Sequence, residues 1–164
     1  MDLFIIRHAW AEERDEAKYP DDALRPLTDA GRQRFTKMVA FLVPRGLKPR
    51  LIATSPMLRC VQTAEILATA LGEKPKVVQR KELLPGGDPK KLFAWTEEQA
   101  VGIEQIAWVG HAPDVSFFAA LLIGQEDGWM NFKKGAIAAI RSSDAPDFGR
   151  GELQWLVTAK VLGV

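Results

Sequence analysis

Short, largely apolar runs alternate along the chain with longer segments in which apolar residues recur at helical spacing. The runs at residues 3–6, 51–54 and 105–109 are each followed directly by polar or charged residues. Runs of this length that contain β-branched residues predict strands buried inside a sheet. A pair of valines at residues 77–78 predicts one further, weaker strand between the second and third of these runs.

The segments between the predicted strands carry helix signals. Thr28, Ser55 and Asp88 are candidate N-cap residues, and the last two precede a proline, which is favoured at the first helical position. The predicted helices cover residues 28–43, 56–71, 88 onward and 112–123. Residues 10–27 are polar and contain two prolines, and residues 84–88 contain a proline and two glycines, so we expect loops there.

The end of the chain departs from this alternation. Residues 136–141 and 153–161 predict two strands joined by a loop that contains a proline and glycines. Strands alternating with helices, followed by a hairpin, predict an α/β three-layer sandwich. Its central sheet is mostly parallel with an antiparallel C-terminal addition, and helices cover both faces. The 164 residues suit one domain spanning residues 1–164.

Composition excludes several classes of protein. Lysine and arginine total 22 against 21 acidic residues, so the basic excess typical of a nucleic-acid binder is missing. The apolar run near the N-terminus is too short for a membrane span or a signal-peptide core, and we expect a cytoplasmic protein. With two histidines and Cys60 as the one cysteine, neither a disulfide within the chain nor a structural zinc site is expected. Cys60 is interpreted as an inert, buried thiol.

Both histidines follow a predicted strand directly. His8 comes after the first strand together with Arg7, and His111 comes after the strand at residues 105–109. Arg59 lies about one helical turn beyond the end of another strand. Ligands of open α/β sheets bind beyond the carboxyl ends of the strands, so these four side chains should meet at one edge. A structural histidine would more often lie in the middle of an element, and we therefore expect a functional site.

Five short motifs follow one another in an order typical of one enzyme family. They are Arg7-His8-Ala9, Arg25-Pro26-Leu27-Thr28 with Gly31, Ser55-Pro56 with Arg59 and Gln62-Thr63-Ala64, Leu84-Pro85-Gly86-Gly87, and Gly110-His111-Ala112-Pro113. This set, over about residues 3–125, resembles the histidine phosphatase (phosphoglycerate-mutase-like) superfamily and is most similar to its short SixA-type phosphohistidine phosphatases. The family usually has glycine where this chain has Ala9. Alanine is tolerated there only if the backbone adopts an ordinary conformation, and we therefore expect one.

The resemblance implies a covalent phosphohistidine on His8. Phosphoryl transfer depends mainly on positioning and on electrostatic stabilisation, and arginine provides planar, permanently charged donors for that purpose. Arg7, Arg25 and Arg59 would form the phosphate cradle, and His111 would donate a hydrogen bond to an equatorial oxygen. No metal or other cofactor is expected.

A general acid is harder to assign. Glu82 and Asp114 are the positional candidates, although Asp114 would also suit the N-terminus of its helix. SixA-type members resemble one another in lacking an obvious acid. A phosphoramidate can lose an imidazole that has taken its proton from solvent, whereas a phosphate ester needs an acid to protonate its leaving group. This difference favours phosphohistidine as the substrate.

Several alternatives remain open at the level of sequence. The preferred partner is a phosphohistidine-bearing protein, such as a phosphotransfer domain or a phosphocarrier, because short connections predict an open site. A small-molecule phosphomonoesterase or phosphomutase is the alternative, and a non-catalytic phosphate-binding module is a third. Three residues also have structural interpretations. Arg25 would suit a surface loop, and Arg59 could form an ion pair with Glu65 or Glu12. Ser55 is better explained as a helix cap than as a nucleophile.

Overall fold

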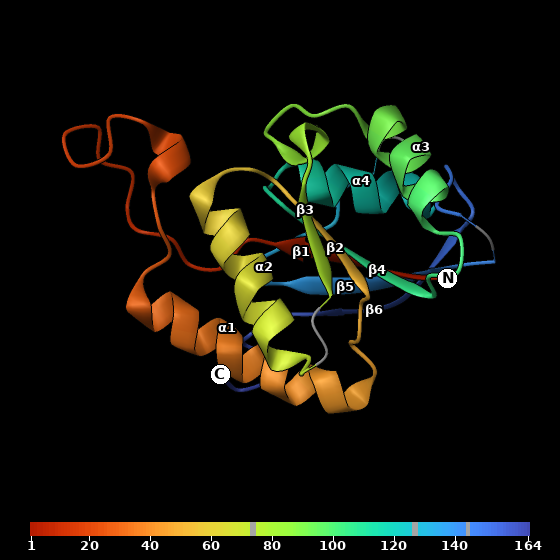
Figure 1. The fold of residues 1–164 in the computed structure, drawn as a ribbon, viewed down its shortest axis with the longest axis horizontal. Coiled ribbons are helices and arrows are strands. Elements are labelled where there is room, and N and C mark those ends of the chain that lie inside the picture. The colour runs from red at the N-terminus through yellow and green to blue at the C-terminus, as the bar shows by residue number, and fades with distance from the viewer. Residues whose placement is uncertain (73–74, 126–127, 144) are drawn as a thin grey trace.

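Six strands form one mixed sheet in the computed structural model, which describes residues 1–72, 75–125, 128–143 and 145–164 (Figure 1). Across the sheet the strands are β3 (Lys76–Gln79), β2 (Leu51–Thr54), β4 (Gln105–Gly110), β1 (Asp2–Arg7), β5 (Ile137–Ser142) and β6 (Gly151–Val157). The first four are parallel to one another, and β5 and β6 pair antiparallel at one side. The predicted fold class is therefore confirmed.

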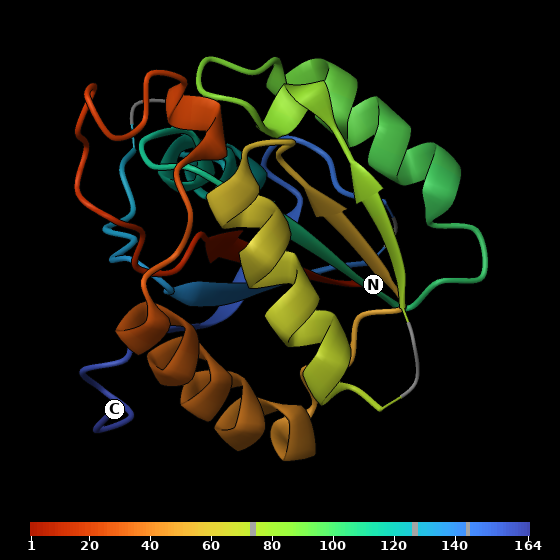
Figure 2. The ribbon, with the colours of Figure 1, turned by 60° about the vertical axis from the view of Figure 1, so that its left-hand side comes forward.

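Two helices cover each face of the sheet (Figure 2). The four are α1 (Asp29–Leu42), α2 (Leu58–Ala70), α3 (Pro89–Gln99) and α4 (Asp114–Leu122). Successive residues of a strand point to opposite faces. Phe4 of β1 accordingly packs in the core beneath α1 and α2, whereas Ile5 packs in the core beneath α3 and α4. An almost continuously apolar β1 is what this double burial requires.

Two of the three predicted helix caps are confirmed. The Thr28 hydroxyl accepts a hydrogen bond from the Gly31 amide at 2.9 Å. The Asp88 carboxylate accepts bonds from the amides of Lys90 and Lys91. Ser55 is different, because α2 begins at Leu58 and its N-cap is Met57. The predicted start at residue 56 was wrong because the Ser55 amide is still bonded to the neighbouring strand, at the Val109 carbonyl, and the helix begins only after this contact.

The last strand ends earlier than predicted. β6 stops at Val157, which pairs with Ile137, the first residue of β5. Beyond Val157 the described part of the chain offers no further strand partner, and the chain turns, with the Thr158 carbonyl accepting from the Val161 amide. The weak strand at residues 77–78 is confirmed and extends to four residues as β3. The predicted loop over residues 10–27 contains a one-turn 3₁₀ helix, η1 (Asp22–Leu24).

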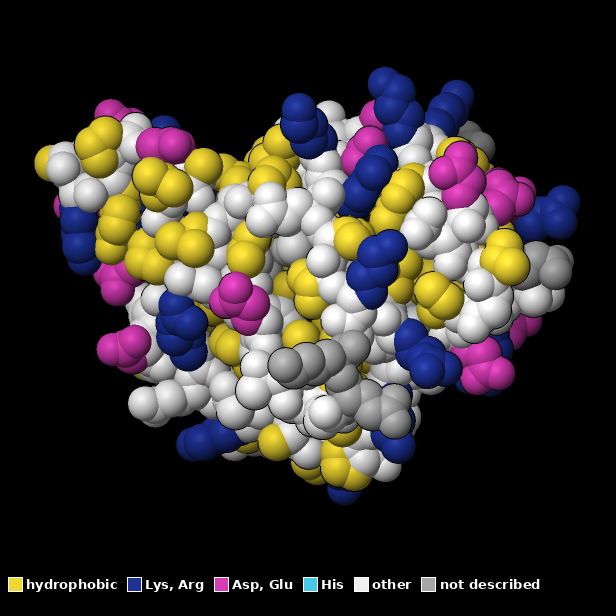
Figure 3. Space-filling model, in the orientation of Figure 1, with side chains coloured by type: hydrophobic (Ala, Val, Ile, Leu, Met, Phe, Trp, Pro, Cys, Tyr) yellow, Lys and Arg dark blue, Asp and Glu magenta, His cyan; other side chains and the backbone are white. Residues whose placement is uncertain are grey.

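Charges of both signs are interspersed over the face of the molecule shown in Figure 3, as the near-neutral composition implies. No histidine is visible on that face. Within the described parts of the chain, no helix is long and apolar enough to cross a membrane.

Candidate active site

The three neighbouring strands β2, β4 and β1 deliver the predicted residues to one edge of the sheet. Arg7 ends β1, and the amide of the following His8 bonds to the Gly110 carbonyl at 2.9 Å. Gly110 ends β4 and is followed by His111, while Ser55 follows β2. Because β4 lies between β1 and β2, the two histidines and Ser55 come together at adjacent strand ends.

The two histidine rings face each other. Their centroids are 5.2 Å apart at an interplanar angle of 61°, and the residues are 8% and 3% exposed. Nδ1 of His8 lies 2.7 Å from the carbonyl oxygen of Ala9. A carbonyl oxygen only accepts hydrogen bonds, so Nδ1 carries the proton and Nε2 keeps its lone pair. The tautomer of His8 is therefore fixed by the backbone carbonyl of the next residue, Ala9.

Both rings are held neutral by their surroundings. Burial lowers the pKa of His8 to about 3, and the positive charges of Arg59 and Arg7 act in the same direction. Burial also lowers the pKa of His111 to about 4, with Arg59 contributing next. A neutral imidazole is the form that can attack phosphorus.

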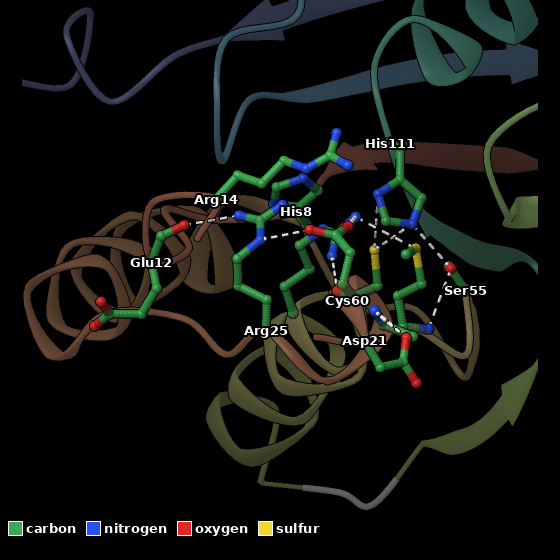
Figure 4. Close-up of polar contacts among 12 residues, drawn as sticks. His8, Glu12, Arg14, Asp21, Arg25, Ser55, Cys60 and His111 are labelled. Carbon is green, nitrogen blue, oxygen red and sulfur yellow. Dashed lines mark hydrogen bonds and ion pairs between the residues drawn. The ribbon is translucent and has the colours of Figure 1, made fainter. Parts of the chain in front are cut away.

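Arg59 and Arg25 are joined by a carboxylate that sequence reasoning missed. Asp22 of η1 binds Arg25 Nε through Oδ1 at 2.8 Å and Arg59 through Oδ2 at 3.1 Å. The Asp22 carbonyl also accepts from Arg59 Nη1. The Glu12 carbonyl accepts from Arg25 Nη1, a contact drawn between these two labelled residues in Figure 4. Arg59 therefore pairs with Asp22, not with Glu65 or Glu12. Arg25, whose side chain is 16% exposed, is not a free surface residue.

Two arginine nitrogens in this site are buried donors without a partner. Arg7 Nη1 donates to the Phe132 carbonyl at 2.8 Å, yet Arg7 Nε has no hydrogen-bond partner among the described residues. The same is true of Arg59 Nε. Buried polar groups are nearly always satisfied, and unpaired cationic donors beside neutral histidines fit an anionic ligand.

The His111 ring also contacts one hydroxyl group and one thiol group. His111 Nε2 lies 2.9 Å from Ser55 Oγ and 3.4 Å from Cys60 Sγ, and Figure 4 shows both groups on the same side of the ring. Ser55 Oγ also accepts the Met57 amide at 3.4 Å. Burial raises the pKa of Cys60 to about 12, so this thiol stays protonated, and its predicted burial is confirmed.

Comparison with known proteins agrees with this geometry. The model of the histidine phosphatase superfamily (branch 1) matches residues 3–113. The chain belongs to the histidine phosphatase superfamily.

Relatives of this superfamily member are similar over nearly its whole length. A protein of Picosynechococcus sp. is 42% identical over 88% of this chain and 87% of its own. Phosphohistidine phosphatase SixA of Escherichia coli is 29% identical over 94% of this chain and 92% of its own. The structure of the protein histidine phosphatase SixA complexed with tungstate superposes with a TM-score of 0.87 at 27% identity, covering 99% of both chains. This homology supports a phosphatase activity.

Ala9 does not distort the signature loop of this histidine phosphatase superfamily member. It is fully buried, it has a negative φ, and its amide donates to Thr63 Oγ1 at 3.0 Å. The ordinary backbone conformation expected for alanine is therefore confirmed.

Both carboxylate oxygens of Glu82 have other partners, whereas only one oxygen of Asp114 does; its Oδ2 is buried without a hydrogen-bond partner among the described residues. Glu82 makes a bidentate ion pair with Arg80 at 3.0 and 2.9 Å. Asp114 Oδ1 accepts from the Gly86 amide at 3.0 Å, which ties the loop of residues 84–88 to the start of α4. Neither carboxylate bonds to His8 or His111 within the described structure. Nor do the described residues include a group of three or more histidine, cysteine or acidic side chains placed to hold a metal ion.

Proposed function

We propose that the chain is a phosphohistidine phosphatase that removes the phosphoryl group from a histidine of another protein. The main support for this proposal is the hydrogen bond from His8 Nδ1 to the Ala9 carbonyl, which leaves Nε2 as a neutral nucleophile. The similarity to SixA over nearly the full chain supports the same substrate class.

The reaction we propose has two transfers. The Nε2 lone pair of His8 attacks phosphorus, and the phosphorus–nitrogen bond to the substrate imidazole breaks as that ring, protonated by solvent, leaves. Water then attacks the phosphoenzyme, releasing inorganic phosphate and restoring neutral His8. Arg7, Arg25 and Arg59 offset the charge on the equatorial oxygens, which is the principal demand of phosphoryl transfer.

His111 would donate a hydrogen bond to one of these oxygens. If the Ser55 hydroxyl donates to His111 Nε2, the ring's proton lies on Nδ1. The Ser55 hydrogen is free for this purpose, because its oxygen already accepts the Met57 amide. Ser55 would thus be a positioning residue that selects the tautomer of His111.

The partners of the candidate acids favour a phosphoramidate over an ester. Both oxygens of Glu82 accept hydrogen bonds from Arg80, and one oxygen of Asp114 is bound to the Gly86 amide. An alkoxide leaving group would require an acid, whereas a protonated imidazole does not. A phosphotransfer domain or a phosphocarrier would supply such a substrate, and a role in cytoplasmic signal transduction is part of this proposal.

The test compares phosphate release from a histidine-phosphorylated phosphocarrier with release from an aryl phosphate ester at matched concentrations. We expect kcat/KM to be much larger for the phosphocarrier. Comparable or faster turnover of the ester would instead support a small-molecule phosphomonoesterase of the same superfamily.

A further inference from the structure

A strongly basic pocket adjoins the candidate active site. Its volume is about 620 Å³, and Arg7 lines it together with Trp10, Arg34, Lys133, Lys134 and Lys160. None of the described residues that line it is acidic. We call it the Lys133 pocket. Such a concentration of one charge is unusual on a chain whose formal net charge is only +1.

Most of the positive charge in the Lys133 pocket is available to a ligand. Lys133, Lys134 and Lys160 are exposed, and none forms an ion pair with another described residue. The two arginines of the pocket are held by other groups. Arg34 donates to the Val164 carbonyl at 2.8 and 3.0 Å and stacks over the Trp10 ring at 4.4 Å, and Arg7 donates to the Phe132 carbonyl. The three lysines therefore set the charge that an incoming group meets.

The pocket is fixed relative to the nucleophile by short contacts. The Gly135 amide donates to the carbonyl of His8 itself at 3.0 Å. Arg7 Nη1 donates to the carbonyl of Phe132, the residue directly before Lys133. The segment that carries both lysines is thus bound to the end of β1. A substrate whose phosphoryl group reaches His8 must place neighbouring residues close to this pocket.

Resting on the proposed function, we propose that the Lys133 pocket binds acidic side chains that flank the phosphohistidine of the substrate protein. Oppositely charged surfaces guide association and select among partners. A protein with lysine or arginine beside its phosphohistidine would be repelled by the same three lysines. The pocket therefore gives the enzyme a preference that the phosphate cradle, which contacts only the phosphoryl group, does not supply.

Two synthetic phosphohistidine peptides, phosphorylated with phosphoramidate, test the proposal. They differ only in their flanking residues, which are glutamate in one and glutamine in the other. At low ionic strength we expect a kcat/KM on the order of 5- to 10-fold higher for the glutamate peptide, mainly through KM, as two or three exposed ion pairs would give. The preference should shrink as salt is raised, because salt screens exposed charges.

The double variant Lys133→Glu/Lys134→Glu should reduce the ratio of kcat/KM for the glutamate peptide to kcat/KM for the glutamine peptide to one or below. Its matched control is Lys48→Glu/Lys76→Glu, which makes the same charge change at exposed positions near the amino ends of the strands. This control should keep the wild-type ratio. The salt dependence of the wild-type enzyme tests the same point without any substitution.

Equal kcat/KM values for both peptides with the wild-type enzyme would overturn the pocket assignment while leaving the proposed function intact. A preference that survives Lys133→Glu/Lys134→Glu would do the same. If neither peptide is hydrolysed while an aryl phosphate is, the proposed function fails, and the assignment of this pocket fails with it.

Discussion

The neutrality of the two histidines has a measurable consequence for stability. Both have an ordinary pKa of 6.5 when unfolded, and in the fold burial lowers these values to about 3 for His8 and about 4 for His111. Between these values and 6.5 the unfolded chain binds more protons than the native one. Stability is therefore fully present above pH 6.5 and is lost as the pH falls towards the native pKa values.

The loss can be estimated from the pKa values. A pH of 5 is 1.5 units below the unfolded pKa of 6.5, and each unit corresponds to about 1.36 kcal/mol. Each histidine therefore lowers the free energy of unfolding by about 2 kcal/mol at pH 5. Because both residues are almost fully buried, little of this is lost to solvent screening. Removing either histidine should remove its share of the pH dependence, whatever it does to stability at neutral pH.

Urea unfolding at pH 7.5 and pH 5.0 measures this effect in the wild type, His8→Gln and His111→Gln. Carboxylates contribute equally to all three proteins, so the comparison isolates each histidine. We expect the decrease in unfolding free energy between the two pH values to be about 2 kcal/mol smaller in each variant. Equal decreases in all three proteins would refute the reasoning, because the histidines would then titrate normally in the fold.

Three further predictions concern the chemistry. Ser55→Ala should lower kcat on a phosphohistidine peptide about tenfold, the loss expected for the one hydrogen bond that positions His111, and Ser55→Thr should restore it. An unchanged kcat would show that Ser55 does not position His111. Glu82→Gln and Asp114→Asn should each slow phosphohistidine hydrolysis only modestly, whereas a loss on the order of 10²–10⁴-fold in steady-state assays would identify a general acid. Phosphate release should be the same with and without excess chelator, and inhibition reversed by added divalent metal would contradict metal independence.

The sequence was sufficient for the parts of the site that strand topology determines. His8 and His111 each follow a buried strand, and parallel neighbours must end at the same edge. Thr28 and Asp88 cap their helices through bonds to residues two or three positions away. Contacts of this kind depend on local order along the chain, and they could be predicted.

Contacts between distant segments could not be predicted in this way. Asp22 meets Arg59 across 37 positions, and its loop has many other charged residues that could have taken its place. Ser55 bonds to His111 across 56 positions, although a serine before a proline is a typical helix-start signal. The end of β6 depends on where β5 begins, so the apolar residues beyond Val157 were misleading.

The central claim is a covalent phosphoryl group on Nε2 of His8. Rapid quenching of the enzyme in base, after mixing with a phosphohistidine protein labelled with ³²P, should trap an acid-labile, base-stable phosphoenzyme. Peptide mapping should place the label on the peptide that contains His8, and His8→Ala should neither carry label nor release phosphate. Label on any other residue, or turnover by His8→Ala above a trace, would contradict the account.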